Sequence, residues 1–269
     1  MAIIKGTLRL QGRLENVTYY TRRGSDQVIA RTVSGPTKEK LATDPSYEVF
    51  RNHQNEWKGC TKFGSLTRYA FGKLHRLADY NLTPVLNKTG KELMKLEPEV
   101  DLGHRQIRLS RYKQVMEGFN FNRVNPFNTV LRVGVAGNID RDNLLGTVTV
   151  PRINAKNDLV NNQKLPYFRL IIVIGTLSDM YFDKDHNEYV PVVVDLHGAN
   201  RVLNSPWYPY SSIVPEQILT VQMTEKQQTM LTDDITVLLS MAVEFGNVGI
   251  LGDTEAVKYA GCGKVLVSK

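Results

Sequence analysis

The residues after Val124 constrain the fold of this chain more than any other part of its sequence. Short runs of apolar and β-branched residues follow one another there, and turn-forming clusters such as Gly198-Ala199-Asn200 separate them. The runs cover residues 130–135, 145–150, 168–174, 189–194, 218–221, 235–243 and 257–267. No amphipathic helical pattern lies between them, so the crossovers that a parallel sheet needs are missing. The pattern indicates an antiparallel sandwich or barrel, and we predict a β-sandwich over residues 124–269.

One of these runs lacks polar residues altogether. Residues 170–174 read Leu-Ile-Ile-Val-Ile. A strand with one face in water alternates apolar and polar side chains, whereas a strand that is buried on both faces does not. We therefore expect residues 170–174 to form a central strand that is covered on both sides.

The middle of the chain has a helical period. From about residue 37 to residue 120, apolar residues recur every three or four positions. Thr37 is expected to cap a short turn, and Asp44-Pro45 fits an N-cap followed by proline at the first helical position. We expect a helix or helix pair that breaks near Gly59 or Gly64, because glycine disfavours a helix interior. Helices are predicted over residues 49–74, 84–96 and 102–116.

The first 31 residues have a strand-like pattern. Two or three short strands are expected, with a hairpin over residues 21–26, where a Gly-Ser-Asp turn follows two arginines. An isolated hairpin of this kind is not stable in water, so its apolar face must pack on something else. That partner is either the rest of this chain or another copy of it.

Together these patterns predict an α+β protein with an N-terminal β-hairpin arm, a helical middle and a C-terminal antiparallel β-sandwich. Residues 118–126 look like a boundary, which predicts domains over residues 1–123 and 124–269. The charge also changes at this boundary. Residues 1–123 hold 22 Lys and Arg against 12 Asp and Glu, whereas residues 124–269 hold 12 against 15. Only the first half is therefore suited to a polyanion, although solvated helix faces alone would also explain its charge.

Two groups of residues are candidates for binding. Six basic residues in the first half are candidate nucleic-acid contacts because their cations can pair with phosphates: Arg22, Arg23, Arg105, Arg108, Arg111 and Lys113. Glutamates dilute the same stretch, and no RRM, KH or zinc-finger signature is present. A proline-stiffened loop carries three aromatic rings that are candidates for binding a partner: Trp207, Tyr208 and Tyr210. The alternative is that this loop folds over one end of the sandwich core.

Catalytic and metal-binding signatures are weak. Asp183, Asp185 and Asn187 have the oxygen spacing that opens a calcium loop, but Glu188 stands at position six and Val194 at position twelve. We predict a plain hairpin turn there. The segment 261–264 reads Gly-Cys-Gly-Lys and lacks the remaining residues of a phosphate loop, so we predict a bend in the last strand. The five histidines and two cysteines show no metal-ligand or nucleophile spacing. We therefore predict no metal, no cofactor and no enzyme activity.

The start of the chain places Lys5 and Arg9 too early to leave the apolar core of a signal peptide. No stretch approaches the roughly 18 consecutive apolar residues of a membrane span. We expect no membrane span and a cytoplasmic location, or a virion if the protein derives from a phage.

The N-terminal half resembles an uncharacterised group of short Bacteroidota proteins. The group combines a strand pair, a hairpin that ends in arginine, a short basic helix, an Asp-Pro helix start and a Gly-Phe-x-Phe-Asn segment before a β-rich half. The matching residues are Gly6, Leu8, Gly12, Tyr19, Tyr20, Arg31, 37–40, Asp44-Pro45, Arg51-Asn52 with Glu56, and 118–122. These motifs are structural, so the resemblance implies the same layout and no catalytic role.

A strand arm without an obvious local partner is typical of proteins that add a strand to a neighbouring sheet. We therefore predict a non-enzymatic structural or interaction protein that assembles with copies of itself through its N-terminal strands. By analogy it is a virion-like or filament-like building block, in a homo-oligomer or with an assembly partner. The alternative is a nucleic-acid-binding protein that uses the basic half.

Overall fold

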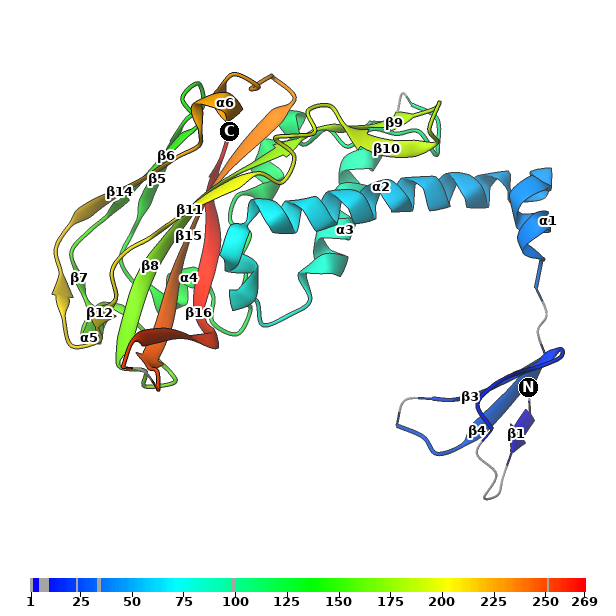
Figure 1. Ribbon diagram of the computed structural model, residues 1–269, viewed down its shortest axis with the longest axis horizontal. Coiled ribbons are helices and arrows are strands. Elements are labelled where there is room, and N and C mark those ends of the chain that lie inside the picture. Colours follow the sequence, from blue (N-terminus) through cyan, green and yellow to red (C-terminus); the bar gives the residue numbers. More distant parts are fainter. Residues whose placement is uncertain (1, 5–9, 23, 33–34, 98–99, 251) are drawn as a thin grey trace. The chain divides into compact units, whose positions relative to one another are not determined.

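The computed structural model describes residues 2–4, 10–22, 24–32, 35–97, 100–250 and 252–269 (Figure 1). It has the predicted α+β composition, with strands at the N-terminus, helices in the middle and antiparallel sheets in the C-terminal half. The chain forms two compact units, Met1–Arg51 and Asn52–Lys269. The helices after Asn52 belong to the same unit as the C-terminal strands.

The first unit contains a four-stranded antiparallel sheet. Its strands are β1 (Ala2–Ile4), β2 (Gly12–Leu14), β3 (Val17–Thr21) and β4 (Val28–Thr32), in the order β1-β4-β3-β2. Strands β3 and β4 form the predicted hairpin. Helix α1 (Lys38–Thr43) and the short 3₁₀ helix η1 (Pro45–Tyr47) follow. Thr37 caps α1 and Asp44 caps η1 through their side-chain oxygens, as the sequence predicts.

Helix α2 (Glu48–Ala70) runs without a break, so the predicted interruption near Gly59 or Gly64 is wrong. A Cβ on Gly59 would lie 2.6 Å from Cγ of Tyr189, and a Cβ on Gly64 would lie 2.2 Å from Oδ1 of Asn87. These glycines therefore let a tyrosine ring and a neighbouring helix approach the backbone of α2. Close packing, and not a helix end, accounts for them.

Further helical elements follow α2 along the chain. The 3₁₀ helix η2 (Gly72–Leu77) follows α2, and α3 (Leu82–Lys95) matches the second predicted helix. The third predicted helix, over residues 102–116, is wrong. That segment contains only the 3₁₀ helices η3 (Leu109–Arg111) and η4 (Lys113–Met116). Its backbone bonds to a strand end instead, because Ile107 and Met180 exchange two N–H···O bonds of 2.9 Å.

The C-terminal half forms two antiparallel sheets that pack face to face, which is the predicted sandwich. The larger sheet has the order β11-β8-β15-β16, with β12 also paired to β8, and the smaller has the order β14-β6-β5. Their bounds are β5 (Ala136–Asp140), β6 (Leu145–Val150), β8 (Tyr167–Ser178), β11 (Asn200–Asn204), β12 (Tyr208–Pro209), β14 (Gln217–Gln222), β15 (Ile235–Val248) and β16 (Thr254–Ser268). One apolar core lies between the two sheets.

Smaller elements connect these strands. Two further strand pairs lie beside the sheets, and three one-turn helices lie in the connections. They are β7 (Ile153–Asn154) with β13 (Ile213–Val214), β9 (Met180–Asp183) with β10 (Glu188–Pro191), α4 (Phe127–Val130), α5 (Ala155–Asp158) and α6 (Glu225–Gln228).

The predicted strand over residues 130–135 is wrong. The N–H of Leu131 bonds back to Phe127, which closes the helical turn of α4, and the strand begins only at Ala136.

Strand β8 is central and covered on both faces, as its run of apolar residues predicts. It lies between β11 and β15. Leu170, Ile172 and Ile174 belong to the core between the sheets. Ile171 and Val173 belong to a second core, which the sheet shares with α2, η2 and α3. The second unit therefore has three layers, a small sheet, a large sheet and a helical layer (Figure 1).

Within the described residues, none of the helices combines the length and the apolar character needed to cross a membrane.

Candidate functional site

The N-terminal sheet is poorly covered by its own unit. Among the described residues before Asn52, only Val28 and Ile29 are buried. Helix α1 buries none of its residues. A small sheet needs an apolar face that is packed against another layer to be stable in water. The strands of this sheet are therefore paired as in a folded domain, but the described residues of the unit do not form a buried core of the usual size.

The edges of this sheet carry exposed apolar side chains. Strands β1 and β2 are its two edges. Ile3 on β1 is 53% exposed and Leu14 on β2 is 66% exposed. Edge strands also present backbone N–H and C=O groups that have no neighbouring strand. This combination makes the sheet a candidate interface for strand pairing.

The six predicted nucleic-acid contacts are divided between the two units of the chain, and one of them lies outside the described residues. Arg22 lies at the β3–β4 turn in the first unit, and Arg23 lies outside the described residues. Lys113 is half-buried at the start of η4. Arg108 and Arg111 both pair with Glu97, with N–O distances of 3.5 and 3.3 Å. Internal carboxylates therefore neutralise part of the predicted basic stretch.

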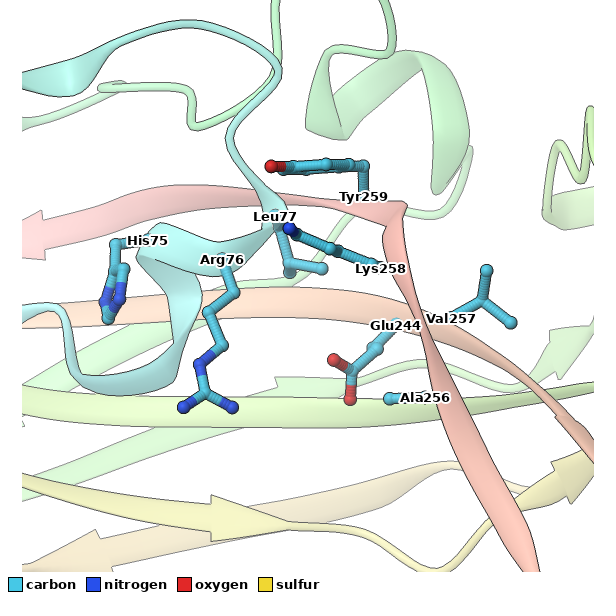
Figure 2. Close-up of a pocket in the computed structure, with 8 residues that line it drawn as sticks. All are labelled: His75, Arg76, Leu77, Glu244, Ala256, Val257, Lys258 and Tyr259. Carbon is cyan, nitrogen blue, oxygen red and sulfur yellow. The ribbon is translucent and has the colours of Figure 1, made fainter. Parts of the chain in front are cut away.

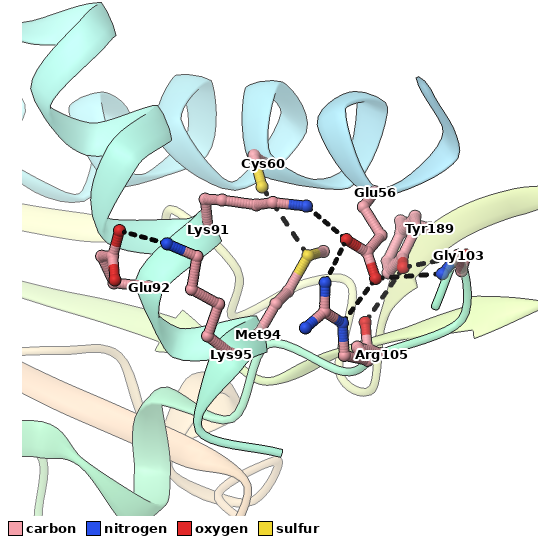
Figure 3. Close-up of polar contacts among 9 residues, drawn as sticks. All are labelled: Glu56, Cys60, Lys91, Glu92, Met94, Lys95, Gly103, Arg105 and Tyr189. Atoms are coloured by element: carbon pink, nitrogen blue, oxygen red, sulfur yellow. Dashed lines mark hydrogen bonds and ion pairs between the residues drawn. The ribbon is translucent and has the colours of Figure 1, made fainter. Parts of the chain in front are cut away.

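Arg105 is the most strongly engaged of these arginines. Its Nε lies 2.6 Å from Oε1 of Glu56, and its Nη2 lies 2.7 Å from Oε2 (Figure 3). Lys91 also donates to Oε2, and the backbone N–H of Gly103 donates to Oε1 at 3.0 Å. Burial by itself would raise the pKa of Glu56, but these bonds lower it to about 2. The side chain of Glu56 is fully buried, so the cluster is an interior ion network.

Sequence reasoning did not assign Glu56 a buried role, although its spacing contains a signal. Gly59, Cys60 and Phe63 are the other buried residues on the same stretch of α2. Glu56 therefore stands at a core position of the helical repeat, where a carboxylate needs a buried partner. Tyr189 closes the cluster by donating its hydroxyl to the carbonyl of Arg105 at 2.9 Å (Figure 3). Burial raises the pKa of this tyrosine.

The three aromatic residues of the proline-stiffened loop make internal contacts. Tyr210 donates its hydroxyl to the carbonyl of Leu159 at 2.7 Å. The ring of Tyr208 packs on Phe168, with centroids 5.6 Å apart. The guanidinium of Arg169 lies 4.5 Å from the centre of the Trp207 ring. These contacts agree with the alternative in which the loop folds over one end of the core.

The calcium-like sequence forms the turn between β9 and β10, so the predicted hairpin is confirmed. Oδ1 of Asp183 accepts the N–H of Asp185 at 2.9 Å, and Oδ2 contacts Nδ1 of His186 at 2.7 Å. The side chain of Asp183 therefore bonds within its own turn.

Two further buried polar groups anchor the second unit. Asp179, directly after β8, accepts Ser110 Oγ at 2.5 Å and Ser110 N–H at 2.9 Å, while burial raises its pKa. His197 accepts the N–H of Ser178 at Nδ1, at 2.9 Å. Its Nε2 has no hydrogen-bond partner among the described residues. Sequence reasoning missed both, because their partners are distant in the chain.

A pocket opens beside the edge strand β16 (Figure 2). It has a volume of about 460 Å³. Its lining comes from η2, β15 and β16, namely His75, Arg76, Leu77, Glu244, Ala256, Val257, Lys258 and Tyr259. Tyr259 has a φ of +62°, which is rare for a bulky residue and costs roughly 1–2 kcal/mol. The sequence did not predict that these residues share a pocket.

Comparisons of the chain with protein-family models, with curated proteins and with solved structures found no match in any of the three. The resemblance to the Bacteroidota group therefore stays a prediction.

Proposed function

We propose that this protein is a non-enzymatic structural or interaction protein that assembles with copies of itself through its N-terminal sheet. The proposal rests on one observation: the strands of that sheet are paired with one another, but few of their side chains are buried. Four ordered strands bury only two of the described residues of their unit, Val28 and Ile29. Burial of further apolar surface is the main source of stability that such a sheet lacks.

A second copy supplies that burial most simply. Antiparallel pairing of one edge strand with the same strand of another copy is self-complementary about a two-fold axis. It would satisfy the free backbone groups of β1 or β2 and cover Ile3 or Leu14. Repetition at both edges would extend the assembly, which is the behaviour of a virion-like or filament-like building block.

The carboxylate partners of Arg105, Arg108 and Arg111 make nucleic-acid binding the weaker alternative. A phosphate backbone would have to compete with Glu56 and Glu97 for these cations.

The test is the mass of the full chain in solution, measured by size-exclusion chromatography with light scattering and with absorbance at 260 and 280 nm. We expect a mass well above 30.4 kDa for the natural chain. The double variant Ile3→Glu with Leu14→Glu places charges on both edges and is expected to run as a monomer. Val124→Glu is the matched control, because Val124 is 79% exposed and lies in the other unit.

Deletion of residues 1–33 provides a second test that does not depend on how the sheet tolerates charge. It is expected to abolish the oligomer. A monomeric natural chain, or an oligomer that survives both the edge charges and the deletion, would refute the proposal. A nucleic-acid signal that disappears in high salt would instead support the alternative.

A further inference from the structure

The pocket beside β16 is created by an irregularity in the sheet. Glu244 pairs with Gly261, and Gly246 pairs with Ala256. Strand β15 has one residue between these pairs, whereas β16 has four, residues 257–260. Extra residues in one strand leave the ladder and re-aim their side chains, and such bulges occur often beside binding sites. Here the bulge brings Lys258 and Tyr259 to the pocket lining.

The backbone of the bulge is held in an unfavourable conformation. Tyr259 has a φ of +62°, and the residue as a whole is 52% exposed. Burial of the ring therefore does not account for the strain. Strained residues cluster where a structure holds a group in place for binding. The group that Tyr259 holds is Lys258, because Nζ of Lys258 lies 4.9 Å from the centre of the tyrosine ring.

Two cations of the pocket are available to a ligand. Arg76 projects from η2 and Lys258 from the bulge, and both are exposed (Figure 2). None of the ion pairs found between described residues involves either side chain. Two uncompensated positive charges suit an anion that carries two negative charges, which a phosphate monoester does near neutral pH.

The carboxylate in the pocket has a separate role. Arg169, which does not line the pocket, contacts Oε2 of Glu244 through Nε at 2.7 Å and Nη2 at 2.5 Å. These contacts neutralise Glu244 through Oε2 and leave Oε1 as an acceptor for a ligand hydroxyl. His75 donates Nδ1–H to the carbonyl of Gly72 at 2.6 Å, which leaves Nε2 as its second polar atom.

From this arrangement we infer that the pocket beside β16 binds a small phosphate monoester that carries hydroxyl groups, such as a sugar phosphate. Arg76 and Lys258 contact the phosphate, and Glu244 accepts a hydrogen bond from a hydroxyl. Tyr259 positions Lys258. A pocket of about 460 Å³ lies within the range of small-molecule sites. The inference is independent of the proposed assembly, because the first unit contributes no residue to the lining.

The experiment is isothermal titration calorimetry of the full chain with ribose 5-phosphate, and with inorganic phosphate and ribose as partial ligands. We expect one site per chain, with ribose 5-phosphate bound more tightly than phosphate and with no binding of ribose. Arg76→Gln and Lys258→Gln are each expected to weaken binding by about tenfold or more. Lys184→Gln, an exposed cation on the β9–β10 turn, is the matched control and is expected to bind normally.

Glu244→Gln tests the second contact. It removes a negative charge from the pocket, so inorganic phosphate is expected to bind more tightly, while the preference for ribose 5-phosphate over phosphate shrinks. Thermal unfolding confirms that each variant is folded. The inference would be overturned by an absence of binding at about 1 mM ribose 5-phosphate. Equal weakening by Lys184→Gln and Lys258→Gln would also overturn it. The Ile3→Glu/Leu14→Glu variant is expected to keep the site, which separates this inference from the assembly proposal.

Discussion

Arg105 holds the buried carboxylate of Glu56 in a two-point contact that joins residues 49 positions apart in the chain. Lys91 supplies a second cation from α3, so the carboxylate ties together α2, α3 and the segment before η3 (Figure 3). Removal of one member of such a buried group leaves charges without a partner, which typically costs 3–5 kcal/mol. The network is therefore a buried polar connection between three segments of the helical layer.

Glu56→Gln is expected to lower the free energy of unfolding by about 3 kcal/mol, because two cations lose their counter-charge. Urea denaturation at neutral pH measures the change. Glu92→Gln is the matched control. Glu92 pairs with Lys95 on the surface of α3, and both side chains are about half exposed. That variant is expected to cost less than about 1 kcal/mol. Equal losses in the two variants would contradict the interior role of Glu56.

Glu56 also predicts how stability falls in acid. Its pKa is lowered from 4.5 to about 2, so the unfolded chain binds a proton more readily than the folded chain between these values. The stabilisation is complete above pH 4.5 and is lost as pH falls towards 2. A shift of this size corresponds to about 3 kcal/mol. Denaturation from pH 5 to pH 2 is expected to be less pH-dependent in Glu56→Gln than in the natural chain.

His197 acts in a different pH range. Burial lowers its pKa from 6.5 to about 4, so its neutral form stabilises the fold fully above pH 6.5. This stabilisation is lost as pH falls from 6.5 towards 4, because the unfolded chain then binds the proton first. The shift corresponds to about 3 kcal/mol.

His197→Asn isolates this contribution. An asparagine oxygen can take the place of Nδ1 in accepting the Ser178 N–H, but it does not titrate. Urea denaturation at pH 7 and pH 4.5 is expected to show a smaller change in unfolding free energy for the variant than for the natural chain. If the unfolding free energy changed equally with pH in the variant and in the natural chain, His197 would not be the titrating group.

Gly59→Ala is expected to destabilise the protein by about 1–3 kcal/mol, although alanine usually strengthens a helix. The added methyl group would lie 2.6 Å from Cγ of the Tyr189 ring, so the ring or the helix would have to shift. Gly134→Ala is the control, because a Cβ there has no atom within 4 Å. That change is expected to be neutral or slightly stabilising. Thermal unfolding distinguishes the two, and a neutral Gly59→Ala would refute the packing account of this glycine.

Much of the layout can be read from local patterns. The caps at Thr37 and Asp44 depend on side chains that bond to the backbone two or three residues later, so neighbouring residues are sufficient to predict them. The apolar run 170–174 predicts burial on both faces because alternation is a local property of a strand. The hairpins at 21–26 and 183–187 follow from turn residues in the same way.

The candidate sites depend on contacts between distant residues. The segment 102–116 has the composition of a helix, but Ile107 finds backbone partners at Met180 and the helix does not form. Gly59 resembles a helix breaker until Tyr189 is placed against it. Arg105 looks available to phosphates until Glu56 is placed beside it.

The sequence by itself therefore determined the class of most segments, the central strand and the strand pattern at the N-terminus, because periodicity, caps and turns act over a few residues. Only the tertiary structure decided which charges are neutralised, where the bulge at residues 257–260 lies and which side chains share a pocket. Register and long-range packing set these features, and both depend on pairs of residues that lie far apart in the chain.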